Sequence, residues 1–202
     1  MPSRLAALSR YTPRLELRPF RRRDVDSLLE AVTESKPQLE PWLPWAADRY
    51  RRADALRFIR DSSAAWVDGR AFDMAIRRLD DPERHLGNIS VWHTSRREQS
   101  GEIGYWVRTS VGSQGIATEA GARVVQAAFE ELELHRVTLR IATGNRASER
   151  IAEKLGFVQE GVLRGEVLVR GEWMDHSLWA LLEEEYPREH PRYALEGWLE
   201  AK

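Results

Sequence analysis

The sequence has 202 residues, no cysteine and a formal net charge of −1, with 31% charged and 42% hydrophobic side chains. The missing cysteine excludes disulfides, thiolate zinc sites and cysteine nucleophiles. The small net charge excludes a protein that binds polyanions through bulk charge. Length and composition fit one domain over 1–202, with a core at about 12–185 and a polar C-terminal tail.

Several partner classes are not expected from the sequence. No apolar run approaches the ~20 residues that span a bilayer, and the first ten residues do not form a secretory signal. We therefore expect a cytoplasmic protein without a membrane partner. The arginines at 21–23 lack interleaved aromatic residues, so nucleic-acid binding is not expected. None of the five histidines has metal-ligand spacing, so no metal is expected.

The first half of the chain predicts a strand, two helices and three further strands. Alternating apolar residues indicate a strand over 15–20. Asp24 can cap a helix with apolar residues at 25, 28, 29 and 32. Prolines at 37, 41 and 44 predict a loop, and a second helix over 56–66 ends near Gly69. Strands follow around 72–76, 86–92 and 102–107, the first two joined by a turn at 80–82.

The second half predicts a loop at 112–115, a helix over 117–129 and a strand over 137–141. A short helix over 148–155 ends at Gly156, and two strands joined by Arg170-Gly171 follow, the second over 174–182. The order β-α-α-β-β-β-α-β-α-β-β indicates an α+β fold. Its mixed sheet is built around one strand–loop–helix unit.

The segment from Gly112 to Gly115 is the most informative part of the sequence. A strand runs into a glycine-containing loop and then directly into a helix. Backbone N–H groups of such a loop, the unpaired N–H groups of the first helical turn and the helix dipole together bind phosphate without a lysine. An ordinary β–α connection is the alternative. The segment lacks the Lys-Ser/Thr of a P-loop and the spacing of a dinucleotide fingerprint.

Gly112-Ser-Gln-Gly-Ile-Ala117 resembles motif A of the GNAT (Gcn5-related N-acetyltransferase) superfamily, Gln/Arg-x-x-Gly-x-Gly/Ala, which holds the pyrophosphate of coenzyme A. Gly112 departs from the motif, so backbone would have to make the first contact. Asn145-Arg-Ala-Ser148 and Glu153-Lys-Leu-Gly-Phe157 resemble the second signature of the family. Glu102-Ile-Gly-Tyr-Trp106 and Pro41-Trp-Leu-Pro-Trp45 are most similar to the RimJ/RimL group, which acetylates N-terminal α-amino groups of ribosomal proteins.

This resemblance implies the GNAT fold, with a mixed, mostly antiparallel sheet, flanking helices and splayed central strands. It implies acetyl-CoA as cosubstrate and direct attack by a primary amine, without an acyl-enzyme. An oxyanion donor is expected from the backbone at or near Val107, and Asn145 can reach the pantetheine arm or be a structural turn residue. The implied coenzyme A site comprises Val107, Gly112, Ser113, Gln114, Gly115, Ile116, Ala117, Thr118, Asn145 and Ser148.

The resemblance also suggests the catalytic groups. Glu102 is the candidate general base, and a solvated strand residue is the alternative. Glu166 is a second candidate, although its alignment needs a one-residue shift. Ala152 stands where many members carry the tyrosine that protonates the thiolate, which leaves the Ser148 hydroxyl as the acid. The alternative role of Ser148 is a local backbone hydrogen bond at the helix start.

Trp42 and Trp45 can line a substrate groove in which Glu40 or Asp48 receives the amine, or they can anchor the loop. The expected reaction is acetyl transfer to a protein N-terminus. The alternatives are a small amine such as an antibiotic or a polyamine, and a non-catalytic module that binds acetyl-CoA and regulates a partner. A homodimer formed through the C-terminal strands is expected from the resemblance.

Overall fold

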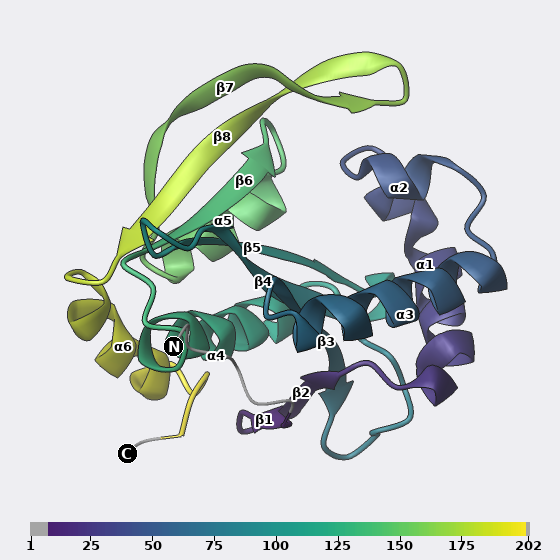
Figure 1. Cartoon of the computed structure of the whole chain (residues 1–202), viewed down its shortest axis with the longest axis horizontal. Coiled ribbons are helices and arrows are strands. Elements are labelled where there is room, and N and C mark those ends of the chain that lie inside the picture. The colour runs from purple at the N-terminus through teal and green to yellow at the C-terminus, as the bar shows by residue number, and fades with distance from the viewer. Residues whose placement is uncertain (1–7, 201–202) are drawn as a thin grey trace.

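The computed structural model describes residues 8–200, which contain one eight-stranded sheet of order β1-β2-β3-β4-β5-β6-β8-β7 (Figure 1). Only β5 and β6 run parallel, and the other neighbouring strands are antiparallel. The α+β class and the mixed sheet are therefore confirmed. The strands are β1 (Arg10–Tyr11), β2 (Leu15–Pro19), β3 (Ala71–Arg78), β4 (Gly87–Ser95), β5 (Ser100–Val107), β6 (Arg136–Ala142), β7 (Val158–Val169) and β8 (Glu172–Leu182).

Helices cover both faces of this sheet. The larger buried cluster joins apolar residues of α4 and α6 to one face of the strands, and the smaller cluster joins α1 and α3 to the other face. Alternation along the strands supplies the two faces, since neighbouring side chains point in opposite directions. The helices are α1 (Val25–Leu39), α2 (Pro44–Ala47), α3 (Arg52–Val67), α4 (Ile116–Glu130), α5 (Arg146–Lys154) and α6 (Tyr186–Leu195).

The feature of the sheet that matters most for function is the short pairing between β5 and β6. The two strands pair only from Ser100 to Glu102 and from Arg136 to Thr138. Beyond this point β5 continues against β4 as far as Val107, and β6 continues against β8 as far as Ala142. The centre of the sheet is therefore open on one side, as predicted for splayed strands.

The loop predicted from prolines at 37, 41 and 44 is partly wrong. Pro37 lies inside α1, which continues to Leu39, and Pro44 begins α2. A proline removes one helical hydrogen bond, but the Glu40 N–H still donates to the Lys36 carbonyl at 2.9 Å. Leu39 is buried in the cluster beneath α1. Tertiary packing therefore carries the helix past its proline.

The predicted polar tail is also wrong, because residues 186–195 form α6. Tyr186 and Tyr193 lie seven positions apart on one helical face and are both buried in the larger cluster, as is Leu199. The Tyr186 ring stacks on Phe129 of α4 with ring centroids 4.9 Å apart. Two buried aromatic side chains thus attach this helix to the core, although most residues of the segment are polar or charged.

The sequence predicted that Asp24 caps α1, but its side chain makes no capping hydrogen bond. Its carboxylate instead accepts hydrogen bonds from Arg18 at 2.7 and 2.8 Å and from the Arg21 N–H at 2.7 Å. Arg77 completes the cluster with an ion pair at 3.1 Å. Asp24, Arg18 and Arg77 are all at most 5% exposed, so the single Asp24 carboxylate offsets one of two buried positive charges and contacts both guanidinium groups.

Candidate active site

A slot of about 230 Å³ occupies the region where β5 and β6 separate. It contains three predicted site residues of different elements, namely Glu102 from β5, Asn145 before α5 and Ser148 within α5. Trp42 lines the same slot from the loop before α2. The structure therefore brings together segments that are more than 40 residues apart in the sequence.

Glu102 is 7% exposed, so the alternative of a solvated strand residue is wrong. Its Oε2 accepts a hydrogen bond from Arg140 Nε at 2.9 Å, and Arg140 Nη1 donates to Glu166 Oε1 at 2.7 Å. Burial raises the pKa of Glu102, although the hydrogen bond and charge of Arg140 oppose this rise. Arg140 thus joins the two carboxylates that were predicted as alternative bases.

Ser148 Oγ lies 2.8 Å from the Oη of Tyr105. This hydroxyl contact is with a residue of β5, so the predicted alternative of a local backbone bond does not describe the Ser148 side chain. Asn145 Oδ1 accepts from the Ser148 N–H at 3.3 Å and caps α5. The Nδ2 donors of Asn145 make no hydrogen bond within residues 8–200 and can serve a bound molecule.

The loop before α4 has the backbone geometry of an anion site. Ser113 and Gly115 have φ angles of 60° and 78°, and Gly115 is the N-cap of α4. Alternation of left-handed and right-handed residues turns successive N–H groups to one side. The N–H groups of Ile116, Ala117 and Thr118 occupy the first turn, where no helical acceptor is available. These donors and the helix dipole favour an anion at this position.

The guanidinium of Arg14 lies beside this loop, which the sequence did not indicate. Arg14 Nη1 donates to the Gln114 carbonyl at 3.1 Å, and Arg14 pairs with the buried Glu119 at 2.6 Å. The Arg14 side chain is 42% exposed. The Arg14 guanidinium thus lies close to Gly115, in a motif where Gly112 replaces the usual Gln or Arg.

The Val107 N–H points into the gap between β5 and β6. The following N–H, that of Arg108, donates to the Leu86 carbonyl on the β4 side at 2.7 Å. N–H groups alternate in direction along a strand, so Val107 presents its N–H to the opposite side. Backbone groups at such an unpaired edge need partners.

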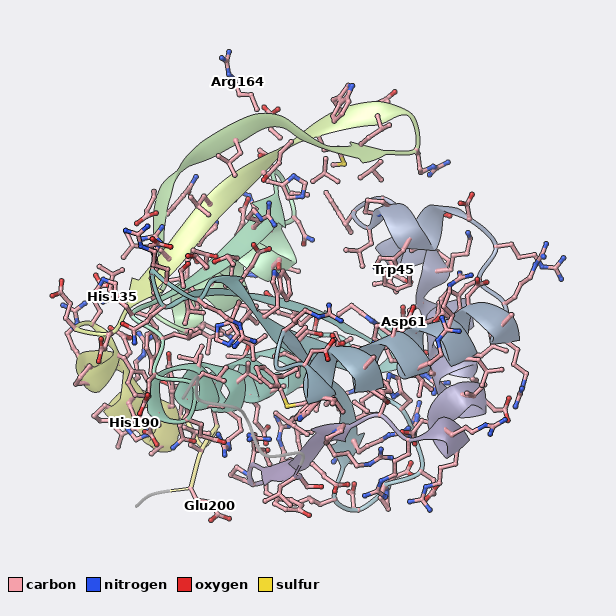
Figure 2. All side chains as sticks on the ribbon, viewed as in Figure 1. Trp45, Asp61, His135, Arg164, His190 and Glu200 are labelled. Atoms are coloured by element: carbon pink, nitrogen blue, oxygen red, sulfur yellow. The ribbon has the colours of Figure 1, made fainter. Side chains whose placement is uncertain are left out.

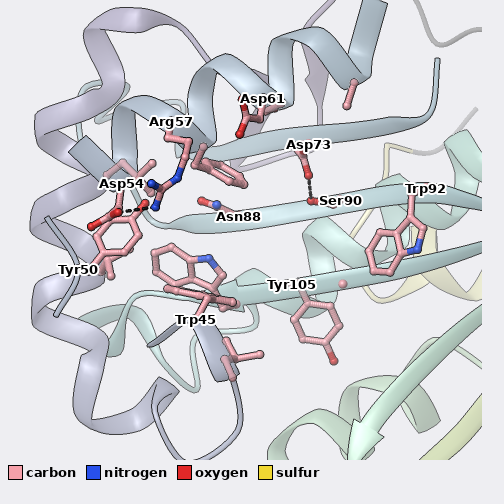
Figure 3. Close-up of a pocket in the computed structure, with 18 of the residues that line it drawn as sticks. Trp45, Tyr50, Asp54, Arg57, Asp61, Asp73, Asn88, Ser90, Trp92 and Tyr105 are labelled. Atoms are coloured by element: carbon pink, nitrogen blue, oxygen red, sulfur yellow. Dashed lines mark hydrogen bonds and ion pairs between the residues drawn. The ribbon is translucent and has the colours of Figure 1, made fainter. Parts of the chain in front are cut away.

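A second cavity of about 920 Å³ adjoins the slot and opens beside α2 and α3 (Figure 3). The two share a wall that includes Leu43, Trp92, Gly104 and Tyr105. A Cβ on Gly104 would meet the Trp92 ring at 3.1 Å, so this wall is closely packed. We call the larger cavity the acceptor cleft, because it is lined by Trp45 and Asp48, two residues of the amine groove that the sequence predicts.

The floor of the acceptor cleft carries Asp73, which accepts a hydrogen bond from Ser90 at 2.5 Å. In Figure 3, these side chains project from β3 and β4, whereas the Tyr105 ring extends from β5 away from them. Trp45 is 42% exposed and lines the cleft, with its ring centroid 6.0 Å from that of Tyr50. Both charge signs are present among the lining residues, which include Asp48, Asp54, Asp61, Arg49, Arg57 and Arg70.

The predicted amine-binding loop is thus divided between two cavities. Trp42 lines the slot and Trp45 lines the acceptor cleft. Asp48 also lines the cleft, but Glu40 lines neither cavity and lies within 3.7 Å of Lys36 and Arg170. In Figure 2, Trp45 lies between α2 and α3, whereas Arg164 projects from the outer side of the β7–β8 hairpin.

Within residues 8–200, no group of three or more His, Asp or Glu side chains is arranged to hold a metal ion. Over the same range, no helix combines the length and apolarity needed to cross a membrane.

An acetyltransferase (GNAT) domain model matches residues 14–158 of the chain. The chain belongs to the GNAT acetyltransferase family. A GNAT relative, the putative ribosomal N-acetyltransferase YdaF of Bacillus subtilis, is 31% identical over 87% of this chain and 94% of its own length. The ribosomal-protein-serine acetyltransferase of Escherichia coli is 25% identical over 82% of this chain and 91% of its own length.

Solved GNAT structures have the same fold. Mycobacterium smegmatis RimJ in complex with CoA-disulfide superposes with a TM-score of 0.82 at 29% identity, covering 90% of this chain and 88% of RimJ. The chain is accordingly an acetyl-CoA-dependent N-acetyltransferase of the RimJ/RimL-like group. Its structure fits the cosubstrate, because the left-handed turn at Gly115 and the free first-turn N–H groups suit a pyrophosphate, and the slot at Glu102 suits a narrow arm.

Besides Arg14, three residues of this GNAT site were not assigned a role from the sequence. Arg140 and His176 line the slot, and His176 Nδ1 is enclosed without a hydrogen-bond partner among the described residues. Tyr105 was quoted only as part of a motif. Alternation places Arg140 on the same strand face as Thr138, opposite Leu139, but its bridging contacts with two other strands depend on tertiary structure.

Proposed function

We propose that this enzyme acetylates the N-terminal α-amino group of a protein, of the ribosomal-protein type, in the cytoplasm. The observation that carries the proposal is the acceptor cleft of about 920 Å³, which shares part of its lining, including Gly104 and Tyr105, with the slot that contains Glu102. This volume is near the upper end of the ~300–1,000 Å³ range of small-molecule pockets. It has room for several residues of an extended chain. The names of the ribosomal-protein relatives support the same acceptor class.

The electrostatics of the slot suit an α-amine. An α-amino group has a pKa of about 7.7–8.0, so its deprotonation at neutral pH costs about 1 kcal/mol. A lysine amine, with a pKa of about 10.4, costs roughly 4–5 kcal/mol. Glu102 is a carboxylate held by a single arginine contact within the slot, which makes it a base of modest strength. We therefore assign the first proton transfer from the acceptor to Glu102, with Glu166 positioning Arg140.

The remaining predicted residues have complementary roles in this proposal. The Val107 N–H stabilises the charge that develops on the carbonyl oxygen as the amine attacks. Residues 112–118 hold the pyrophosphate, and Asn145 binds the pantetheine arm through its Nδ2 donors. Ser148 supplies the proton for the departing thiolate. Trp42 and Trp45 flank the path of the acceptor.

The test is release of the CoA thiol from acetyl-CoA in the presence of three acceptor classes. These are short peptides with free N-termini, N-terminally blocked peptides that contain lysine, and a panel of small amines including polyamines. We expect the peptide α-amine to have the highest kcat/KM. A small amine that exceeds every peptide would reassign the acceptor, and acetyl-CoA binding without turnover would indicate the non-catalytic module.

We also propose a homodimer formed through the C-terminal strands. Leu168 and Trp173 are directly paired across β7 and β8 and are 47% and 67% exposed. Large apolar side chains that remain exposed side by side favour a partner surface. Sedimentation of the wild type and of Trp173→Glu should show a dimer and a monomer, respectively. A monomeric wild type would contradict this proposal without affecting the acceptor assignment.

A further inference from the structure

The contact between Tyr105 and Ser148 connects the two sides of the open sheet. Tyr105 belongs to β5, whereas Ser148 belongs to α5, which follows β6. Their hydroxyl oxygens lie 2.8 Å apart, and Tyr105 Oη is also 3.4 Å from the Ser148 carbonyl. Tyr105 lines both the acceptor cleft and the slot. Tyr105 therefore connects the acceptor cleft with Ser148, the predicted acid.

The proposed reaction requires a route for a second proton. An acceptor that arrives as an ammonium ion loses two protons when it becomes an amide, and the departing thiolate gains one. Glu102 accounts for the first proton. The helix position that carries a tyrosine in many relatives is Ala152, which is fully buried and has no hydroxyl. A path from the acceptor nitrogen to the sulfur must therefore use other groups.

We infer that Tyr105 and Ser148 form a proton relay that carries the second proton from the acceptor nitrogen to the departing sulfur. The nitrogen–carbon bond forms and the carbon–sulfur bond breaks. The nitrogen proton passes to Tyr105 Oη, the Tyr105 proton passes to Ser148 Oγ, and the Ser148 proton passes to sulfur. Each hydroxyl gains and loses one proton, so neither ends ionised. This inference rests on the proposed acetyl transfer.

The environment of Tyr105 agrees with a relay better than with a free-standing acid. Burial raises the pKa of Tyr105 to about 12, against an opposing hydrogen bond with Ser148. A thiol has a pKa of about 8.5, which is below the pKa of Tyr105. Proton transfer from Tyr105 to the thiolate is therefore unfavourable if the tyrosine stays ionised. A hydroxyl that receives one proton while it donates another avoids the tyrosinate.

A double-mutant cycle tests whether the two hydroxyls act in series. We expect Tyr105→Phe and Ser148→Ala each to lower kcat about 10–100-fold, with KM for acetyl-CoA unchanged. Because both variants interrupt one path, the double variant should be no slower than the slower single variant. Multiplied losses, or a Tyr105→Phe variant within about twofold of wild type, would overturn the relay. Tyr11→Phe, which alters an exposed tyrosine on β1, is the matched control.

The leaving group supplies a sharper test. Acetyl thioesters of N-acetylcysteamine and of thiophenol both lack the nucleotide, but the aryl thiolate departs more readily because its thiol has the lower pKa. The loss caused by Tyr105→Phe should persist with the alkyl thioester and largely disappear with the aryl thioester. Equal losses with both donors would mean that Tyr105 does not act at the sulfur.

A binding measurement separates this inference from the proposed function. The pKa of the CoA thiol bound to the protein can be followed by ultraviolet thiolate absorbance, without any turnover. A hydrogen bond donated by Ser148 to the thiolate lowers that pKa. Ser148→Ala should therefore raise it, and Tyr105→Phe, which removes the hydrogen-bond partner of Ser148, should raise it by a smaller amount. If the wild type acetylates no amine but this difference is found, the proposed function fails and the hydrogen-bond path stands. If the wild type is active and the difference is absent, the inference fails alone.

Discussion

Replacement of Glu102 by glutamine tests the proposed base and also identifies the acceptor class. The substitution removes the carboxylate at nearly constant volume in a position that is 7% exposed, so bulk water cannot readily replace it. We expect kcat to fall about 10²–10³-fold, which corresponds to about 3–4 kcal/mol at 1.36 kcal/mol per factor of ten. KM for acetyl-CoA should not change, because the phosphate loop lies at the start of α4.

The pH dependence of the Glu102→Gln rate distinguishes an α-amine acceptor from a lysine acceptor. Without a protein base, the rate follows the fraction of neutral amine in solution. For an α-amine with a pKa of about 7.7–8.0, that fraction rises roughly five- to eightfold between about pH 7 and pH 8.5 and then levels off. For a lysine with a pKa of about 10.4 it rises about 30-fold over the same interval without levelling.

The assay is initial-rate CoA release with saturating acetyl-CoA, with Glu98→Gln on the β4–β5 turn as an exposed control. In the wild type, burial raises the pKa of Glu102 while Arg140 opposes the rise. Activity should therefore be lost as pH falls and Glu102 takes up a proton. A Glu102→Gln rate within about threefold of wild type would refute the assignment of Glu102 as the base.

Three further substitutions test the supporting structure. Gly115→Ala should lower the free energy of unfolding by about 1–2 kcal/mol, because φ is 78°, and calorimetry should show weaker CoA binding. Arg14→Met should raise KM for acetyl-CoA about 3–10-fold with kcat unchanged; an unchanged KM would leave Arg14 a structural role only. Asp24→Asn should cost about 3–5 kcal/mol in urea unfolding, because it leaves buried Arg18 and Arg77 without their carboxylate.

The buried Asp24 cluster also predicts how stability depends on pH. Burial raises the pKa of Asp24, but the hydrogen bonds from Arg18 and the Arg21 N–H and the charges of Arg18 and Arg77 outweigh it, so the net pKa is lowered. A lowered folded-state pKa contributes stability above the unfolded value of about 3.9. That contribution should be lost as the pH falls through the folded-state pKa, and the loss should be absent in Asp24→Asn.

Local signals in the sequence predicted the elements that depend on local chemistry. The loop before α4 was predicted because left-handed backbone at Gly115 and a helix start at Ile116 are properties of adjacent residues. Alternation of Phe72, Met74 and Ile76 likewise predicted β3. The continuation of α1 past Pro37 and the existence of α6 were missed, because both depend on burial against elements distant in sequence.

The site was predictable as a set of residues and not as a set of contacts. The resemblance supplied Glu102 and Ser148, which do line one slot. Glu102 meets Arg140 across 38 residues, and Tyr105 meets Ser148 across 43 residues. The periodicity of a strand or helix relates residues that are only a few positions apart, so it cannot predict contacts over such sequence separations. The contacts of Arg140 and Tyr105 therefore depend on the arrangement of the strands in the sheet, which the sequence did not predict.

The short pairing of β5 with β6 has a mechanical consequence. The sheet consists of a five-stranded part, β1 to β5, and a three-stranded part, β6 to β8, joined in the sheet by a seam of three residue pairs. A ligand that fills the gap supplies partners for unpaired backbone groups on both parts. Cosubstrate binding should therefore slow amide hydrogen exchange in residues 103–107 and 139–142 together and raise the unfolding temperature. The donor of the acetyl group would then also lock the two parts of the sheet.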